Sequence, residues 1–156
     1  MLSDFIKPDN IIVNLESEDK EECFAELLEV LVAKNPGLDR RTALEALIAR
    51  EDKKSTAVFP YVAVPHAVSD SLTKTVVAIG ISHSGIEFEP VNSEENNKNP
   101  IVNVIFEILF DETDTEGHLH VLRDILKLVI QPDFVKTVLN AKSAKEVYNY
   151  IVSLES

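Results

Sequence analysis

Apolar residues recur at steps of three and four in two stretches near the start of the chain, which predicts two helices there. Within residues 17–34 the apolar positions are interleaved with glutamates, as on a helix with one buried face. Residues 35–37 read Asn-Pro-Gly, a sequence that ends a helix. Asp39 follows and can cap a second helix that continues to about Glu51.

The last third of the chain repeats this pattern and predicts three more helices. The first covers about residues 116–130 and ends before Pro132, because proline lacks an N–H and clashes with the preceding turn. A short helix follows over residues 133–139. Ser143 and Glu146 have the spacing of a capping box, which places the start of the last helix at Ser143.

Between the helices lie apolar runs that are typical of β-strands. Residues 75–81 and 100–110 are apolar on both faces, as central strands are when both faces of their sheet are covered. A shorter run at residues 62–64 predicts a third strand. Helices at both ends and strands in the middle predict an α/β layered domain with a mixed sheet. The polar run at residues 92–99 predicts an exposed loop or hairpin tip that is too short to divide the chain, so residues 1–156 are expected to form a single domain.

The charge balance narrows the class of partner. The chain has 15 Lys and Arg against 27 Asp and Glu, a formal net charge of -12, whereas nucleic acids and anionic membrane surfaces require clustered cations. We therefore expect no nucleic-acid partner. No apolar run reaches the roughly 20 residues of a membrane span, so no membrane insertion is expected. Cys23 is the only cysteine, and the first ten residues lack the basic and apolar regions of a signal peptide, which predicts a cytoplasmic location.

The sequence Val-Pro-His at residues 64–66 is the first candidate for chemistry. Pro65 fixes its own φ angle and restrains Val64, so the chain leaves the strand in a defined direction and presents His66 at the sheet edge. A histidine in an ordinary turn would have the same local sequence, so the pair alone does not identify a site.

Two further side chains lie at helix ends. Arg50 is in the last turn of the second helix, where it could also serve only the helix dipole. His118 opens the helix after the long strand, where it could also be an ordinary surface residue. A helix N-terminus favours an anion and would keep the His118 imidazole neutral.

Together these residues fit phosphoryl transfer. A neutral imidazole is a good nucleophile near neutral pH, which suits His66. Phosphoryl oxygens require positive or hydrogen-bond-donating groups around them. Arg50 offers two parallel donors, and His118 can donate one more hydrogen bond.

The same segments, in this order and spacing, resemble the mannitol–fructose class of enzyme IIA domains of the bacterial sugar phosphotransferase system (PTS), including its nitrogen-regulatory branch. That family has Arg-Glu, a Thr-rich turn, Ile-Pro-His and later a His-Leu that opens a helix. The corresponding residues here are Arg50-Glu51, Ser55-Thr56, Val64-Pro65-His66 and His118-Leu119. The likeness covers nearly the whole chain.

The resemblance implies a mixed, five-stranded sheet with helices on both faces, and neither a metal nor a cofactor. It implies that His66 is the phosphorylated residue and that Arg50 and His118 support it. The donor would be the histidine-containing phosphocarrier protein (HPr), and the recipient a sugar-transport subunit or a regulatory target.

The loop at residues 56–61 departs from the family's Gly-rich sequence, since it reads Thr-Ala-Val-Phe-Pro-Tyr. Glycine permits positive φ angles and close approach to an anion. We therefore expect this loop to follow a different path, with Phe59 and Tyr61 forming a lid or a surface for a partner. The departure favours the nitrogen-regulatory branch. It also keeps open a second hypothesis, a IIA-like module that is not phosphorylated and binds a transporter, a kinase or a transcription regulator.

The remaining histidines suggest a weaker alternative. His66, His118 and His120 could form a zinc site, but it lacks the cysteine or closely spaced carboxylate ligands that zinc sites use. His83 follows a predicted strand and is expected in a loop.

Acidic residues directly precede His118. Asp111, Glu112, Asp114 and Glu116 are expected to form a charged rim that steers a basic donor. The centre of that docking surface would be apolar. Its side chains would be Phe59, Tyr61, Val62 and Val68.

Overall fold

The computed structural model describes residues 1–92 and 98–156. Five strands form one sheet in the order β1-β4-β5-β2, and β3 also pairs with β5. The central pair, β4 and β5, is antiparallel, and the other pairs are parallel. The expected mixed, five-stranded sheet is thus confirmed. The strands are β1 (Ile11–Ile12), β2 (Val62–Ala63), β3 (His66–Ser69), β4 (Val76–Glu87) and β5 (Ile101–Asp111).

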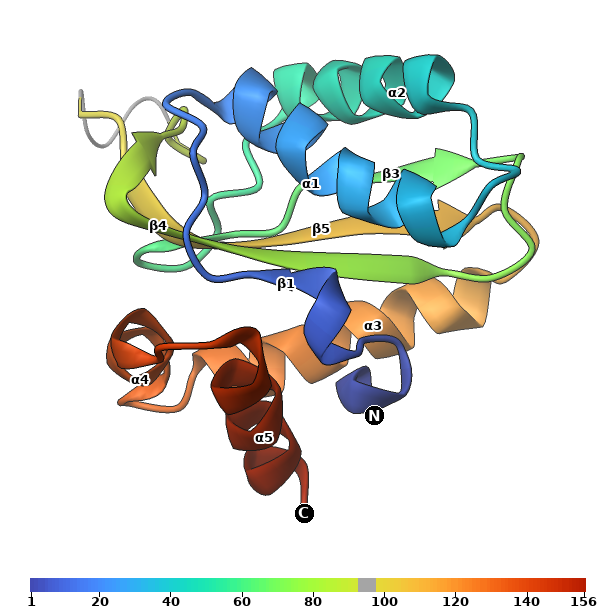
Figure 1. Ribbon diagram of the computed structural model, residues 1–156. Coiled ribbons are helices and arrows are strands. Elements are labelled where there is room, and N and C mark those ends of the chain that lie inside the picture. Colours follow the sequence, from blue (N-terminus) through green and yellow to red (C-terminus); the bar gives the residue numbers. More distant parts are fainter. Residues whose placement is uncertain (93–97) are drawn as a thin grey trace.

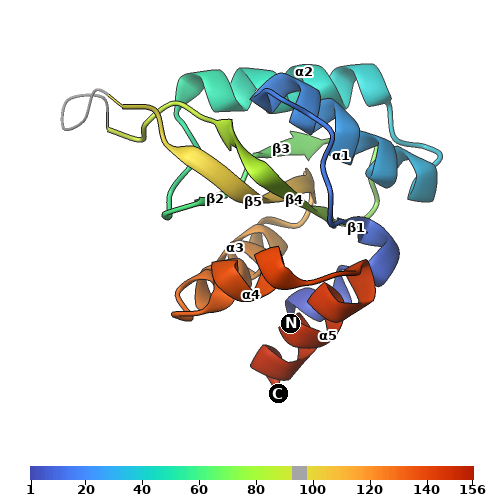
Figure 2. The ribbon, with the colours of Figure 1, turned by 60° about the vertical axis from the view of Figure 1, so that its left-hand side comes forward.

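Helices cover both faces of this sheet, as expected (Figures 1 and 2). One face carries α1 (Lys20–Lys34) and α2 (Arg40–Lys53). The other face carries α3 (Thr115–Val129), α4 (Phe134–Asn140) and α5 (Ala144–Glu155). Two short 3-10 turns, Leu2–Asp4 and Pro8–Asn10, precede β1. Among the described residues, no helix is both long and apolar enough to cross a membrane.

The sheet separates two apolar cores. Side chains alternate between the faces of a strand, so Val77, Ile79 and Ile81 of β4 belong to the core under α3, α4 and α5. Val76 and Ala78 belong to the core under α1 and α2. Because both faces are covered, these strands are mainly apolar, which made them recognisable in the sequence.

The cap of α2 agrees with the sequence prediction, whereas the starts of α1 and α5 differ from it. The carboxylate of Asp39 accepts hydrogen bonds from the N–H groups of Arg41 and Thr42, so α2 is capped as predicted. α1 begins at Lys20, later than residue 17, because Asp19 is its cap and accepts from the N–H of Glu22 at 2.8 Å. Ser17 lies before the helix and donates to the carboxylate of Glu26 through its N–H and hydroxyl.

The start of α5 also differs from the prediction. Ser143 accepts from the N–H of Glu146, but the Glu146 carboxylate accepts from Lys142 N at 3.0 Å, so the reciprocal half of the capping box is not made with Ser143.

The strands contain the larger corrections. β1 and β3 were not predicted. β4 extends to Glu87, so His83 lies in a strand and the expectation of a loop is wrong. The pairing of β4 with β5 shifts between Ile81 and Ile86, which marks a bulge, and Gly85 there has a φ of 88°. The polar loop predicted over residues 92–99 falls mainly on residues 93–97, outside the described residues.

Candidate functional site

His66 is placed by an interruption of the edge strand. β2 pairs with β5 at Val104 and Ile105, and β3 pairs with the same edge further along, with His66 opposite Ile108. Pro65 lies between the two short strands. Proline donates no hydrogen bond and is confined to edges within sheets, but its carbonyl still accepts from Ile108 N at 3.0 Å. His66 is therefore held by regular pairing on both sides of Pro65.

One nitrogen of the His66 imidazole is committed to the backbone. Nδ1 lies 2.8 Å from the carbonyl oxygen of Val64. A carbonyl oxygen only accepts, so Nδ1 carries the hydrogen in the neutral ring and Nε2 keeps its lone pair. Burial lowers the pKa of His66 below its ordinary value of 6.5, and the nearby positive charge of Arg50 lowers it further, against the Val64 carbonyl and Glu51, which raise it. The net result is a neutral imidazole near pH 7.

Arg50 shares a pocket with His66. The pocket has a volume of about 360 Å³ and is lined by both side chains together with Ser55 and Thr56. Arg50 donates through Nη1 to the carbonyl of Lys54 at 2.7 Å, which fixes its guanidinium beside the loop that follows α2. The other wall of the pocket is apolar. It is formed mainly by Leu122, Ile125, Leu126 and Val129 of α3.

Glu51 holds this loop in place, a role that the sequence did not reveal. Its carboxylate is 4% exposed and accepts hydrogen bonds from the N–H of Thr56 at 2.8 Å and from the Thr56 hydroxyl at 2.6 Å. A buried carboxylate needs such partners to offset the loss of water. The Arg-Glu pair that ends the helix therefore divides its tasks, because Arg50 faces the pocket and Glu51 anchors the segment that borders it.

His118 reaches the site from the other helical layer through Phe110. Its ring stacks on Phe110 with the centroids 4.0 Å apart, and the His66 ring meets Phe110 edge-on at 5.8 Å. His118 Nε2 lies 3.0 Å from the carbonyl oxygen of Asp111 and donates to it in the neutral ring, so Nδ1 is left free. His118 is not among the residues that line the pocket of His66 and Arg50. The structure thus brings Arg50 and His66 into one pocket and places His118 beside it.

Part of the expected anion site at the start of α3 is occupied by the chain itself. The Asp114 carboxylate accepts from Gly117 N at 2.9 Å, and His118 N donates to the Asp114 carbonyl at 3.3 Å. The N–H groups of Gly117 and His118 are therefore already used within the chain and are not available to an anion.

Comparison with known proteins identifies the family. Residues 4–153 match the family model described as "Phosphoenolpyruvate-dependent sugar phosphotransferase system, EIIA 2". The chain belongs to this family. It is 26% identical over 150 residues to the fructose-specific EIIABC component of Bacillus subtilis, covering 96% of this chain but only 23% of that protein.

Solved structures of IIA proteins share the fold. Nitrogen regulatory protein IIA-Ntr from Neisseria meningitidis superposes with a TM-score of 0.84 at 24% identity, covering 96% of this chain and 98% of that one. A complex of enzyme IIA-Mtl with phosphorylated enzyme IIB-Mtl from Escherichia coli matches with a TM-score of 0.77 at 20% identity, covering 95% and 97%.

The loop at residues 56–61 lacks the family's glycines but still contains one residue with a positive φ angle. Val62 N donates to the Phe59 carbonyl at 3.0 Å across Pro60 and Tyr61, and Tyr61 has a φ of 67°. The third residue of such a turn is normally a glycine when its φ is positive, because a residue with a Cβ atom pays about 1–2 kcal/mol for that conformation. Tyr61 thus adopts a backbone conformation that glycine adopts more readily, and its carbonyl accepts from the N–H groups of Asn103 and Val104 at 2.9 and 3.0 Å.

The acidic rim needs one correction. Asp111 is the last residue of β5 and is only 9% exposed, so it cannot belong to a solvated rim. Its Oδ1 accepts from the N–H and hydroxyl of Thr113 at 3.0 and 2.9 Å. Glu112 and Glu116 are exposed, whereas the Asp114 carboxylate is used as the cap of α3.

The zinc alternative is not supported. Within residues 1–92 and 98–156 there is no group of three or more His, Cys, Asp or Glu side chains that could hold a metal ion. His120 is exposed, and His66 and His118 have Phe110 packed against both rings.

Proposed function

We propose that this chain is a phosphocarrier that accepts a phosphoryl group on Nε2 of His66. The donor is the histidine-containing phosphocarrier protein, and the recipient is a PTS sugar-transport subunit or a regulatory target. The observation that carries the proposal is the geometry of His66, whose Nδ1–H is held by the Val64 carbonyl while the ring lines a pocket with Arg50.

The chemistry follows from that geometry. The Nε2 lone pair attacks the phosphorus of the donor's phosphohistidine, and the donor's N–P bond breaks as the new bond forms. The electron pair of the broken bond stays on the donor's imidazole. The Nδ1–H bond to Val64 stabilises the positive charge that develops on the His66 ring. Arg50 binds the phosphoryl oxygens through its guanidinium, and His118 supports the site through the Phe110 ring that it shares with His66.

The test is phosphorylation in a reconstituted cascade. The full chain is incubated with phosphoenolpyruvate, enzyme I and HPr, and the intact mass is followed with time. We expect one added phosphoryl group, located on the His66 peptide. His66→Ala should abolish the label. His118→Ala should only slow it, because His118 supports the site from beside the pocket and does not accept the group. Label retained in His66→Ala would refute the assignment, and complete loss in both variants would leave His118 as an equal candidate for the nucleophile.

A second function, binding without phosphorylation, is favoured by the turn at residues 59–62. Tyr61 keeps a strained backbone there and exposes 57% of its side chain, as a residue that contacts a partner would. The target would be a transporter, a kinase or a transcription regulator. Absence of any label on the wild-type chain under conditions that label a known IIA protein would select this function.

The proposal extends to the domain organisation and to the location of the protein in the cell. Residues 1–156 act as one IIA domain, and the site requires no cofactor or metal. The net charge of the chain, -12, suits a cytoplasmic protein that binds basic protein partners.

A further inference from the structure

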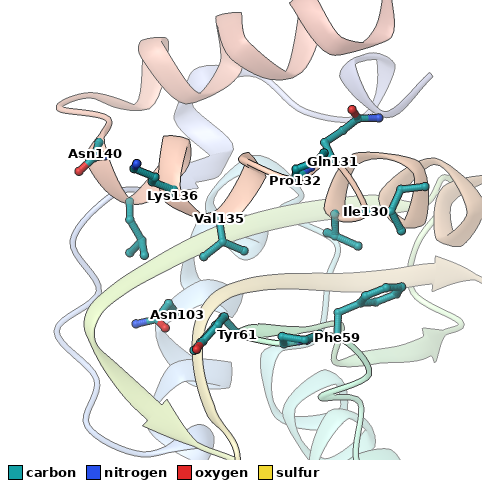
Figure 3. Close-up of a pocket in the computed structure, with 12 residues that line it drawn as sticks. Phe59, Tyr61, Asn103, Ile130, Gln131, Pro132, Val135, Lys136 and Asn140 are labelled. Atoms are coloured by element: carbon teal, nitrogen blue, oxygen red, sulfur yellow. The ribbon is translucent and has the colours of Figure 1, made fainter.

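A second and larger cavity lies next to the His66 pocket. It has a volume of about 840 Å³ and is bounded by the turn at residues 59–61, the start of β5, the end of α3 and the helix α4 (Figure 3). We call it the α4 cavity. Pockets that bind small molecules have volumes of about 300–1,000 Å³, so its size suits one small ligand.

Most of the walls of the α4 cavity are apolar, and part of this apolar surface is uncovered. Ile130 is 58% exposed and Tyr61 is 57% exposed, although both are large hydrophobic side chains. The left-handed backbone of Tyr61 holds its ring at the cavity, since the Tyr61 carbonyl is fixed by two N–H groups of β5. The other apolar lining residues are Phe59, Val129, Pro132, Val135 and Leu139.

Three polar groups of the α4 cavity lie toward the same side, with Lys136 and Asn140 on α4 and Asn103 across from them on β5. In Figure 3 the amine of Lys136, the amide of Asn140 and the amide of Asn103 lie at the left, whereas Phe59 and Ile130 lie at the right. Asn103 is oriented by a hydrogen bond from its Nδ2 to the Ser82 carbonyl at 2.9 Å. The cavity is therefore polar at one end and apolar at the other.

The charge at the polar end is a single cation. Lys136 makes no ion pair with any residue in the described ranges 1–92 and 98–156, and no Asp or Glu lines the cavity. Gln131 lies on the other side of Figure 3, near Ile130, and its amide points away from the cavity and donates to the Lys127 carbonyl at 3.3 Å.

We propose that the α4 cavity binds a small organic monoanion with an aromatic body. The acid group lies against the Lys136 amine and the amides of Asn103 and Asn140, and the body lies between Phe59, Tyr61 and Val135. The polar end matches one negative charge, and the apolar walls with two aromatic rings match a flat hydrophobic body. The proposal does not depend on phosphorylation of His66.

The test uses two fluorescent probes with closely similar bodies. 8-Anilinonaphthalene-1-sulfonate carries one negative charge, and N-phenyl-1-naphthylamine lacks it. Both are titrated against the folded, full-length chain at neutral pH. We expect saturable binding of the sulfonate at one site, with the neutral probe weaker by about fivefold, as loss of one partly solvated ion pair predicts.

Substitutions then show whether the probe binds in the α4 cavity. Lys136→Met should weaken the sulfonate about fivefold and leave the neutral probe unchanged, since only the charge is lost. Lys145→Met, at an exposed position of α5 outside the cavity, is the matched control and should change neither affinity. Ile130→Asp should weaken the sulfonate more than tenfold, and the high exposure of Ile130 allows the variant to fold.

Several results would overturn the proposal. These are the absence of a saturable site, binding that survives both Lys136→Met and Ile130→Asp, or an equal loss of both probes in Lys136→Met. A loss in Arg50→Met without one in Lys136→Met would place the probe in the His66 pocket and would also overturn it.

Discussion

Replacing Glu107 should stabilise the protein, increasingly so as the pH rises. Glu107 lies in the middle of β5 opposite Ala78, and its side chain is 0% exposed. Neither carboxyl oxygen has a hydrogen-bond partner within the described part of the chain. Its neighbours along the strand, Ile105 and Leu109, belong to the core under α1 and α2, so the carboxyl faces that core. Burial, and after it the negative charge of Glu107, raises the pKa of the Cys23 thiol in α1, which agrees with this placement.

Burial raises the pKa of Glu107 well above its ordinary value of 4.5. Below pH 4.5 the carboxyl is protonated in both the folded and the unfolded chain, and it adds no pH dependence. Between 4.5 and the folded pKa only the unfolded chain loses the proton, so the free energy of unfolding falls by about 1.4 kcal/mol per pH unit. Above the folded pKa the loss stops growing. The folded protein is therefore most stable, with respect to this group, at the acidic end of that window.

Two substitutions separate the effect of ionising Glu107 from the effect of burying its polar atoms without partners. Glu107→Gln cannot ionise, so its stability advantage over the wild type should widen by about 2.7 kcal/mol between pH 5 and pH 7 while the folded pKa lies above that range. Glu107→Leu also removes the unpartnered polar atoms and should be about 1–3 kcal/mol more stable than Glu107→Gln at every pH.

The measurement is urea unfolding of the three proteins at pH 5, 6, 7 and 8, with Glu112→Gln as a control for the loss of one exposed acid. Unfolding free energies of wild type and Glu107→Gln that run parallel across this range would refute the reasoning, because they would mean that the carboxyl ionises alike in both states.

Three further predictions concern the site. The lowered pKa of His66 should appear as a histidine titration below 6.5 in NMR spectra, and a titration at or above 6.5 would contradict it. The neutral His66 ring contributes to the stability of the folded protein above pH 6.5, and this contribution is lost as the pH falls through the folded pKa. Glu51→Ala leaves the Thr56 N–H and hydroxyl without their acceptor, so it should lower the unfolding free energy by about 2–4 kcal/mol and slow phosphorylation, and an unchanged urea midpoint would contradict the anchoring role. Replacing Glu112 and Glu116 together by Gln should slow phosphorylation by HPr at low salt and leave the rate at high salt nearly unchanged, whereas a rate that is independent of salt in the wild type would show that these charges do not steer the donor.

The sequence predicted elements whose own pattern is strong and missed those that depend on neighbours. The helices at both ends have a clear apolar period, and β4 and β5 are long apolar runs, so all were found. β1 has two residues, which is too short for any period to show, and β3 exists because β5 offers an edge at that place. Pairing of this kind is set by the tertiary fold and leaves little trace in a four-residue segment.

The site was predicted in part for the same reason. His66 and Arg50 carry recognisable chemistry at a recognisable spacing, and the structure places them in one pocket. Phe110, which lies between the two histidine rings, appeared only as one more apolar residue of a strand. Asp111 continued an acidic run in the sequence and so seemed exposed, although its place at the end of β5 buries it. Burial and contact partners of single polar residues follow from the assembled layers, which local sequence does not specify.

Both helical layers contribute side chains to the site, so the geometry around His66 depends on how the two layers are aligned. Arg50 comes from α2 on one face and His118 from α3 on the other, while His66 sits on the edge strand between them. Each layer is seated on its own apolar core, so a repacking in either core moves one of the two flanking groups and leaves the other in place. A variant can thus keep its fold, its helix content and its melting behaviour and still lose alignment around His66. Activity would then detect displacements of a layer that are too small for a stability measurement to register.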